Sequence, residues 1–313
     1  MTNTTKKKSL QNFFLKLAAC LLIISLVDFT AGAILNKYYF NQQSGYDYLT
    51  TCAIENTTAD ILILGSSRAV NIYNTDIFAK QTKLSCFNAG RYGEPIFYHY
   101  AVLKAALKRY TPKTVILSFD AGNFSINAEA YDRIAALLPY YKRHPEIHSI
   151  VELKSPFEKM KLLSSIYPFN SLPLSIVAGN RESNKAKYSN SNGFIPIEKT
   201  FEGELKTFDY TKEKQLDPVK IEVYKSLMQE CINRKVELVV ICPPYQIHRI
   251  GVDASINEGK RLAQQNDIRF LDYSADTSFT NYPALFADFR HLNIRGVEKF
   301  SNVIIDTLKK RFQ

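Results

Sequence analysis

The chain has 313 residues, of which 46% are hydrophobic and 22% are charged, and its formal net charge at pH 7 is +10. This composition excludes a disordered chain, and the length suits one large domain or two of modest size. Residues 1–40 carry +4 of the net charge, and the other +6 is spread without the basic and aromatic clusters of nucleic-acid-binding proteins, so no nucleic-acid partner is expected.

An apolar segment near the N-terminus is the first predicted element. Three lysines at positions 6–8 precede the apolar run Phe13–Leu35, and Leu17–Leu35 alone provides about 19 residues, close to the minimum for a helix that spans a bilayer. A secretory signal peptide is the alternative, but the run is long for one and no convincing cleavage site precedes a polar mature start. We expect residues 1–40 to form an uncleaved single-pass anchor with a cytoplasmic N-terminus, because the lysines flank its amino end.

The anchor is expected to lead into an extracytoplasmic domain that covers residues 41–313. Asp28 lies inside the apolar run and would be unfavourable in lipid, so we expect it near the outer interface, in reach of water, or against another helix. Asn41–Ala59 is interpreted as a linker that leads into the domain.

Strands and helices alternate from residue 60 onward. Short apolar runs of the kind found in strands buried on both faces are DILILG, CFNAG, TVILSFD, VELVVICPP and IRFLDYS. Helical patterns fall within residues 71–85, 94–110, 217–235, 253–266 and 293–312. This alternation predicts an α/β fold, a flavodoxin-like three-layer sandwich with a five-stranded parallel sheet. Between Phe124 and Gln215 it is interrupted, which predicts a largely helical and loop insertion, about 124–215, that covers one end of the sheet.

The cysteines give no sign of a metal centre. Cys20 lies in the anchor, and the other four have no CxxC spacing, so we expect no zinc site. Cys86 and Cys242 fall in strand-like runs and are predicted to be core residues. A disulfide is permitted outside the cytoplasm but is not implied.

Polar residues follow the predicted strands at the edge of the sheet where ligands bind in parallel α/β folds. The first strand runs into GSSR, with Ser67 in the third position, and the second and third strands are followed by Gly93 and Asn123. The segment DFRHLNIRG, just before the last helix, contains Asp288 and His291 three residues apart. These residues are expected to meet at one site.

Their chemistry suits acyl transfer. A serine hydroxyl becomes a nucleophile when a histidine takes its proton, and a carboxylate orients that histidine. Ser67, His291 and Asp288 are predicted to fill these three roles. Ser67 and Gly93 would supply backbone N–H groups, and Asn123 its side-chain amide, to an oxyanion hole. Taken alone, each residue also has an ordinary structural interpretation as a cap or turn residue.

Two further residues are candidates for contact with the substrate. Arg68 could bind an anionic group, although a surface arginine at the start of a helix is the simpler interpretation. Tyr245 follows the fourth predicted strand and could line the pocket.

The motifs ILILGSSR and DFRHLNIRG resemble the SGNH/GDSL hydrolase superfamily over Asp60–Gln313, except the insertion. Ser66 stands where the family usually has aspartate, and this GSS form is similar to membrane-anchored members, including D-alanyl transfer proteins of teichoic acid and enzymes of polysaccharide acylation. The block DAGNF lacks the family's GxND order, which leaves Asp120 as an alternative residue that shapes this loop.

The resemblance implies a serine esterase or O-acyltransferase without metal or cofactor. Its substrate would be an ester, acetyl or similar, of a cell-envelope glycan or an acylated small molecule, and a membrane acyltransferase is an implied partner. The alternative is a non-catalytic member that binds a glycan or scaffolds an envelope complex. A flavodoxin-like nucleotide binder is disfavoured, because the sequence has neither GxGxxG nor GxxxxGK[ST].

Overall fold

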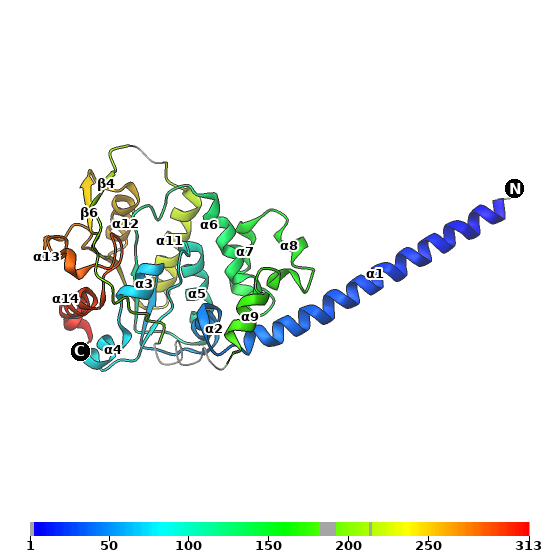
Figure 1. The fold of residues 1–313 in the computed structure, drawn as a ribbon, viewed down its shortest axis with the longest axis horizontal. Coiled ribbons are helices and arrows are strands. Elements are labelled where there is room, and N and C mark those ends of the chain that lie inside the picture. The colour runs from blue at the N-terminus through cyan, green and yellow to red at the C-terminus, as the bar shows by residue number, and fades with distance from the viewer. Residues whose placement is uncertain (1–2, 182–191, 213–214, 313) are drawn as a thin grey trace.

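The protein is described here by a computed structural model that covers residues 3–181, 192–212 and 215–312 (Figure 1). Five strands form one parallel sheet in the order β2-β1-β3-β5-β7. This is the strand order of a flavodoxin-like fold, so the predicted fold class is confirmed. The strands are β1 Ile61–Leu64, β2 Cys86–Asn88, β3 Thr114–Ser118, β5 Glu237–Cys242 and β7 Arg269–Asp272.

The strand residues divide between two hydrophobic cores because side chains alternate across a sheet. Leu62 and Leu64 of β1 pack on one face with the helices α5 (Ile96–Arg109) and α11 (Pro218–Asn233). Ile61 and Ile63 pack on the other face with α14 (Ile294–Phe312). All four are completely buried, which explains the unbroken apolar run. The helices that cover the two faces are α3 Ser67–Ile72, α4 Thr75–Thr82, α5 Ile96–Arg109, α11 Pro218–Asn233, α12 Ala254–Gln265 and α14 Ile294–Phe312.

The N-terminal helix α1, Asn3–Phe40, projects from this body (Figure 1). Within the described residues it is the one helix long and apolar enough to cross a membrane, a property that a membrane anchor and a signal sequence share. Its last turn packs into the protein, because Tyr39 is buried against Tyr140 and Phe169. The carboxylate of Asp28 accepts the N–H of Ser165 in the insertion at 2.6 Å. Asp28 therefore contacts the protein and is not surrounded by water alone.

The insertion is largely helical in its described part, and its helices lie between the sheet and α1, whereas its strand β4 lies beside β6 on the other side (Figure 1). Its helices pack beside α5 and α1 instead of covering the strand ends, because their apolar residues, such as Leu137 and Ile150, are buried there. The polar part at 182–191 and residues 213–214 lie outside the described residues. The described elements are α6 Ala128–Asp132, η2 Arg133–Tyr140, η3 Pro145–Ile147, α7 His148–Val151, η4 Glu152–Lys154, α8 Glu158–Lys161, η5 Tyr167–Phe169, α9 Pro173–Gly179 and β4 Lys206–Asp209.

Two regions differ from the expectation. The predicted linker Asn41–Ala59 contains helix α2, Gly45–Thr51, and the π-helical turn η1, Cys52–Asn56, because Leu49 and Ile54 are buried in the core. A second, two-stranded sheet also forms where β4 pairs in parallel with β6, Ile247–Ile250. Short helical segments α13 Thr277–Thr280 and η7 Pro283–Leu285 precede α14.

All five cysteines are free, and Cys86 and Cys242 are buried, as predicted.

Candidate active site

Helix α3 begins immediately after β1 because Gly65 permits a very tight turn. Gly65 has φ +150°, and a Cβ atom there would lie 2.7 Å from the Cβ of Ser118 and 2.8 Å from that of Ala69. The side chain of Ser66 then caps the helix by accepting the N–H of Arg68 at 3.4 Å. Ser67 is therefore the first residue of α3 and stands at the carboxyl edge of the sheet.

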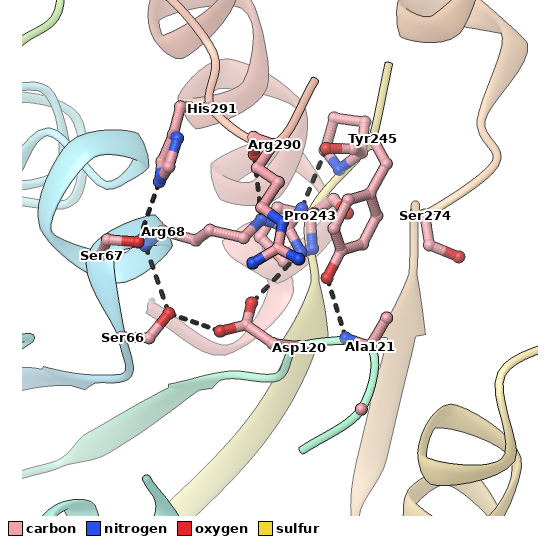
Figure 2. A network of polar contacts seen from close by, with 12 residues as sticks. Ser66, Ser67, Arg68, Asp120, Ala121, Pro243, Tyr245, Ser274, Arg290 and His291 are labelled. Atoms are coloured by element: carbon pink, nitrogen blue, oxygen red, sulfur yellow. Dashed lines mark hydrogen bonds and ion pairs between the residues drawn. The ribbon is translucent and has the colours of Figure 1, made fainter. Parts of the chain in front are cut away.

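Ser67, His291 and Asp288 form a continuous series of hydrogen bonds. The Oγ of Ser67 lies 2.8 Å from Nε2 of His291 (Figure 2). On the other side of the ring, Nδ1 lies 3.0 Å from both carboxylate oxygens of Asp288. When Nδ1 donates to the carboxylate, Nε2 is left to accept the serine proton, as a general base must. The three residues predicted from the sequence thus lie in hydrogen-bonding contact.

The turn that carries Asp288 and His291 is held by its own backbone. One carboxylate oxygen of Asp288 accepts the N–H groups of Arg290 at 2.8 Å and of His291 at 2.9 Å. The N–H of Ala287 donates to the carbonyl of His291 at 2.8 Å. Partial burial alone raises the pKa of Asp288, but the hydrogen bonds from His291 and from the backbone outweigh it and hold the pKa at about 2. The carboxylate is therefore ionised at neutral pH.

Asn293 fixes this turn to the last helix. Its side-chain oxygen accepts the N–H groups of Arg295 and Gly296, each at 3.1 Å, and so caps α14. Its amide group donates to the carbonyl of Ala284 at 2.8 Å. These hydrogen bonds explain why asparagine follows His291 and Leu292 in the motif HLN.

Arg68 is buried and joins four segments of the chain. Only 2% of its surface is exposed. Its Nη1 donates to the carboxylate of Asp120 at 3.2 Å, and its Nε donates to the carbonyl of Arg290 at 3.1 Å. Its Nη2 donates to the carbonyls of Pro243 and Pro244 at 2.6 and 2.9 Å. The interpretation of Arg68 as a surface residue is therefore wrong, because this guanidinium links α3 to the loops after β3 and β5 and to the histidine turn.

The ring of Tyr245 packs against the Arg68 guanidinium. The guanidinium carbon lies 3.6 Å from the centre of the tyrosine ring, a cation–π contact, and the tyrosine hydroxyl accepts the N–H of Ala121 at 2.8 Å (Figure 2). Asp120 accepts the hydroxyl of Ser66 as well as Arg68. Asp120 therefore connects the loop after β3 to the start of α3, through Ser66 and Arg68.

A small cavity opens beside Ser67. Its volume is about 120 Å³, and Ser66, Ser67, Arg68 and Tyr245 are among the residues that line it. At about 30 Å³ for each water molecule, this space holds about four waters or a short acyl group.

Three aromatic residues form a wall of this cavity that was not predicted from the sequence. They are Phe208, Tyr210 and Phe289, and the rings of Phe208 and Phe289 stack with their centres 5.7 Å apart. Phe208 belongs to β4, inside the insertion, so the paired strands β4 and β6 bring the insertion to the candidate site. The spacing FxY at 208–210 is the signal that could have indicated a strand here.

Gly93 and Asn123 lie on the loops after β2 and β3 but do not line the cavity within the described residues. Gly93 has φ +71°, and a Cβ atom there would lie 2.6 Å from Nη1 of Arg133, so a larger residue would be strained. The backbone N–H of Asn123 donates to the carbonyl of Asp120 at 3.1 Å. The oxyanion role of both residues stays a prediction. Among the described residues, no three His, Cys, Asp or Glu side chains gather as a metal site would require.

The sequence matches no protein-family model and no curated protein. Among solved structures, the chain is similar to a protein of Bacteroides fragilis described as a candidate acylhydrolase, with 14% identity, a TM-score of 0.40, and coverage of 81% of this chain and 88% of that one. It is also similar to the acetyl xylan esterase AlAXEase, with 12% identity and a TM-score of 0.40. This match covers 79% of this chain and 99% of that one. A third similar structure is LAE5, an alpha/beta hydrolase enzyme from the metagenome of Lake Arreo, Spain, with 12% identity, a TM-score of 0.37, and coverage of 81% and 96%.

Proposed function

We propose that the protein is a membrane-anchored serine esterase or O-acyltransferase of the SGNH type. The observation that carries this proposal is the series of hydrogen bonds from Ser67 through His291 to Asp288. A surface serine has no need of an oriented histidine, whereas a nucleophilic serine does. The motifs around the three residues are also the ones that resemble this superfamily.

In the proposed reaction, Oγ of Ser67 attacks the carbonyl carbon of an ester while Nε2 of His291 takes the hydroxyl proton. The tetrahedral intermediate collapses to an acyl-enzyme, and His291 returns the proton to the departing alcohol. Water or a sugar hydroxyl then attacks the acyl-enzyme in the reverse sequence of steps. Asp288 stabilises the imidazolium, and the N–H groups of Ser67 and Gly93 with the amide of Asn123 are the proposed oxyanion donors.

The proposed substrate is an acetyl or similarly small ester of a cell-envelope glycan. The cavity of about 120 Å³ is suited to a short acyl group. The stacked rings of Phe208 and Phe289 offer a flat apolar surface on which the C–H face of a sugar ring can pack. In a transferase, a membrane acyltransferase would supply the acyl group.

The proposed location is the membrane, with α1 as an uncleaved anchor. Its residues Asp28 and Tyr39 contact the insertion, and removal of the helix would leave the insertion's polar and apolar partner groups uncovered. The lysines at the amino end of α1 favour a cytoplasmic N-terminus and an extracytoplasmic domain. The mass of the mature chain, purified from membranes, tests whether α1 is retained.

Fluorophosphonate labelling of the full-length chain in detergent tests the catalytic role. The wild type should be labelled on Ser67, as identified by peptide mass, and both Ser67→Ala and His291→Ala should lose the label. Ser278→Ala is a matched control, because Ser278 also lies in the first turn of a helix and is exposed, but it has no histidine partner among the described residues. A folded wild type that takes no label on Ser67 would contradict the proposal.

A glycan-binding protein without catalysis is the alternative. It is favoured by one observation, that Gly93 and Asn123 do not line the cavity within the described residues. In that case Ser67→Ala would keep its affinity for an acetylated oligosaccharide, and the wild type would release no acetate from it. Acetate release that disappears in Ser67→Ala would exclude this alternative.

A further inference from the structure

A second apolar surface lies on the insertion, outside the candidate active site. Phe157, Met160 and Leu163 are 64%, 68% and 81% exposed, and they lie on or beside the short helix α8. Two lysines of α8, Lys159 and Lys161, are also exposed. We call Phe157, Met160 and Leu163 the α8 surface. Large apolar side chains exposed together on one short segment are characteristic of a protein or membrane contact.

The segment that follows the α8 surface is attached directly to helix α1. The carboxylate of Asp28 accepts the hydroxyl of Ser164 at 2.5 Å and the backbone N–H groups of Ser165 and Ile166 at 2.6 and 3.3 Å. One turn further along α1, a Cβ atom on Gly32 would lie 2.4 Å from the Cβ of Ser165. The lack of a side chain at Gly32 therefore lets this segment pack against the helix backbone. These contacts fix where along α1 the α8 surface lies.

That position corresponds to the boundary of a bilayer. The exposed apolar side chains of α1 that precede Asp28 run from Leu10 to Val27, a length of about 27 Å at about 1.5 Å for each residue. A hydrocarbon core is about 30 Å thick. The large apolar side chains along this part of α1 are exposed, as expected for a helix surrounded by lipid. When Leu10–Val27 spans the core, the span lies closer to the N-terminus than the predicted Leu17–Leu35, and Lys16 extends its ammonium group toward the nearer interface. Asp28 then reaches the opposite interface, and the α8 surface lies at the depth of the lipid headgroups.

A groove between α1 and the insertion adds charge to this region. Its volume is about 460 Å³, and its lining includes the apolar residues Phe29 and Phe169 together with Lys37 and Lys142. Lys37 is exposed, and Lys142 donates from Nζ to the hydroxyl of Ser165 at 3.4 Å. Apolar walls with cations beside them complement a phospholipid, whose acyl chain and anionic phosphate need both.

We propose that the α8 surface is a second membrane contact and that the groove binds the headgroup of an anionic phospholipid. Phe157, Met160 and Leu163 enter the interface of the leaflet from which α1 emerges, and Lys37 and Lys142 face the lipid phosphate. Two contacts, one from α1 and one from the α8 surface, hold the sheet in one orientation relative to the membrane. This inference rests on the proposed anchor and is independent of the esterase chemistry.

Tryptophan fluorescence tests the proposal, because the natural chain contains no tryptophan. Full-length Met160→Trp, reconstituted in phosphatidylcholine vesicles with 25 mol% phosphatidylglycerol (about one lipid in four), is compared in brominated and ordinary acyl chains. Bromine quenches tryptophan on contact, so Met160→Trp should lose about half of its emission in the brominated vesicles. Leu22→Trp, on the lipid-exposed part of α1, is the control for insertion of the anchor, and Tyr282→Trp is the exposed control near α13.

The outcomes separate the two proposals. Quenching of Leu22→Trp and Met160→Trp, with Tyr282→Trp unchanged, supports the membrane contact. Quenching of Leu22→Trp alone overturns it and leaves the anchor intact, whereas no quenching of Leu22→Trp overturns both. Quenching of Met160→Trp should weaken when phosphatidylglycerol is omitted or when Lys37 and Lys142 are both replaced by Gln. If Met160→Trp is quenched equally with and without phosphatidylglycerol and in the double lysine variant, the headgroup site is overturned.

Discussion

Replacement of Arg68 by methionine should destabilise the whole fold, although Arg68 lies beside the candidate nucleophile. Methionine keeps much of the apolar volume of the arginine side chain but removes its donors. The change leaves the carboxylate of Asp120 without its ion-pair partner, and it leaves the carbonyls of Pro243, Pro244 and Arg290 without their donor. These losses all act on groups at the carboxyl edge of the sheet.

The expected loss in free energy of unfolding is about 3–5 kcal/mol, which is the range for removing one partner of a buried ion pair. The lower half of this range is favoured, because the carboxylate of Asp120 is 23% exposed and can recover some solvation. This range is for the removal of a whole ionic partner, so it already includes the lost hydrogen bonds to the carbonyls, which are not added separately. Arg68→Lys keeps the charge but cannot reproduce the forked geometry, so its loss should be intermediate.

Thermal unfolding followed by circular dichroism, on the full-length chain in one detergent, measures the effect. Arg68→Met should lower the Tm by about 10 °C, given that 1 kcal/mol corresponds to about 2–4 °C in a protein of similar size. Arg133→Met is a matched control, because Arg133 pairs with Glu129 on the surface and its side chain is 40% exposed; such pairs contribute about 1 kcal/mol or less. If Arg68→Met melted within about 2 °C of the wild type, or no lower than Arg133→Met, the argument would be refuted.

Three further predictions concern the site and its surroundings. Asp288→Asn should slow fluorophosphonate labelling by about 10³–10⁴-fold with unchanged circular dichroism, because Asn cannot hold the histidine tautomer; unchanged labelling would show that Asp288 does not act on His291. Gly65→Ala should lower the urea-measured free energy of unfolding by about 2–4 kcal/mol through the clash with Ser118 and Ala69. Gly45→Ala, with φ +88° but nothing within 4 Å, should lose less, and equal losses would contradict the clash argument. Burial raises the pKa of Glu94 to about 7 from an ordinary value of 4.5, so stability is full below pH 4.5 and falls as the pH rises towards 7 and beyond. Glu94→Gln should therefore gain about 2–3 kcal/mol on the wild type at pH 8 and much less at pH 5; a gain that does not depend on pH would contradict it.

The order of the main strands and helices could be predicted because apolar runs and helical spacing of apolar residues are local patterns in the sequence. An apolar run such as ILIL at 61–64 has to be buried on both faces, and the helix patterns between such runs favour parallel crossovers. Ser67, Gly93 and Asn123 follow the ends of β1, β2 and β3 by three to five residues, and Asp288 and His291 share one turn. Their positions relative to the sheet therefore also followed from local signals. Their catalytic roles stay a proposal.

The features that were missed depend on contacts between distant segments. The strands β4 and β6 pair across about 40 residues, and β4 is mostly exposed, so neither strand has a strong apolar pattern of its own. Helix α2 is short, and it packs against α9 of the insertion, which is distant in the sequence. The role of Arg68 could not be predicted, because three of its four hydrogen-bond partners are backbone carbonyls, which carry no residue-specific signal.

The closed turn from Ala287 to His291 makes the Asp288–His291 pair a rigid unit. The hydrogen bonds that Asp288 and His291 make within the turn are local, so they survive any movement that carries the turn as a whole. The contact between Ser67 and His291 joins residues 224 positions apart and depends on long-range contacts such as the hydrogen bond from Arg68 to the carbonyl of Arg290. Partial loosening of α14 on heating would therefore separate nucleophile from base while leaving the base correctly oriented. Such a protein would lose its reactivity at a temperature where its circular dichroism spectrum still reports a folded chain, and it would recover the reactivity on cooling.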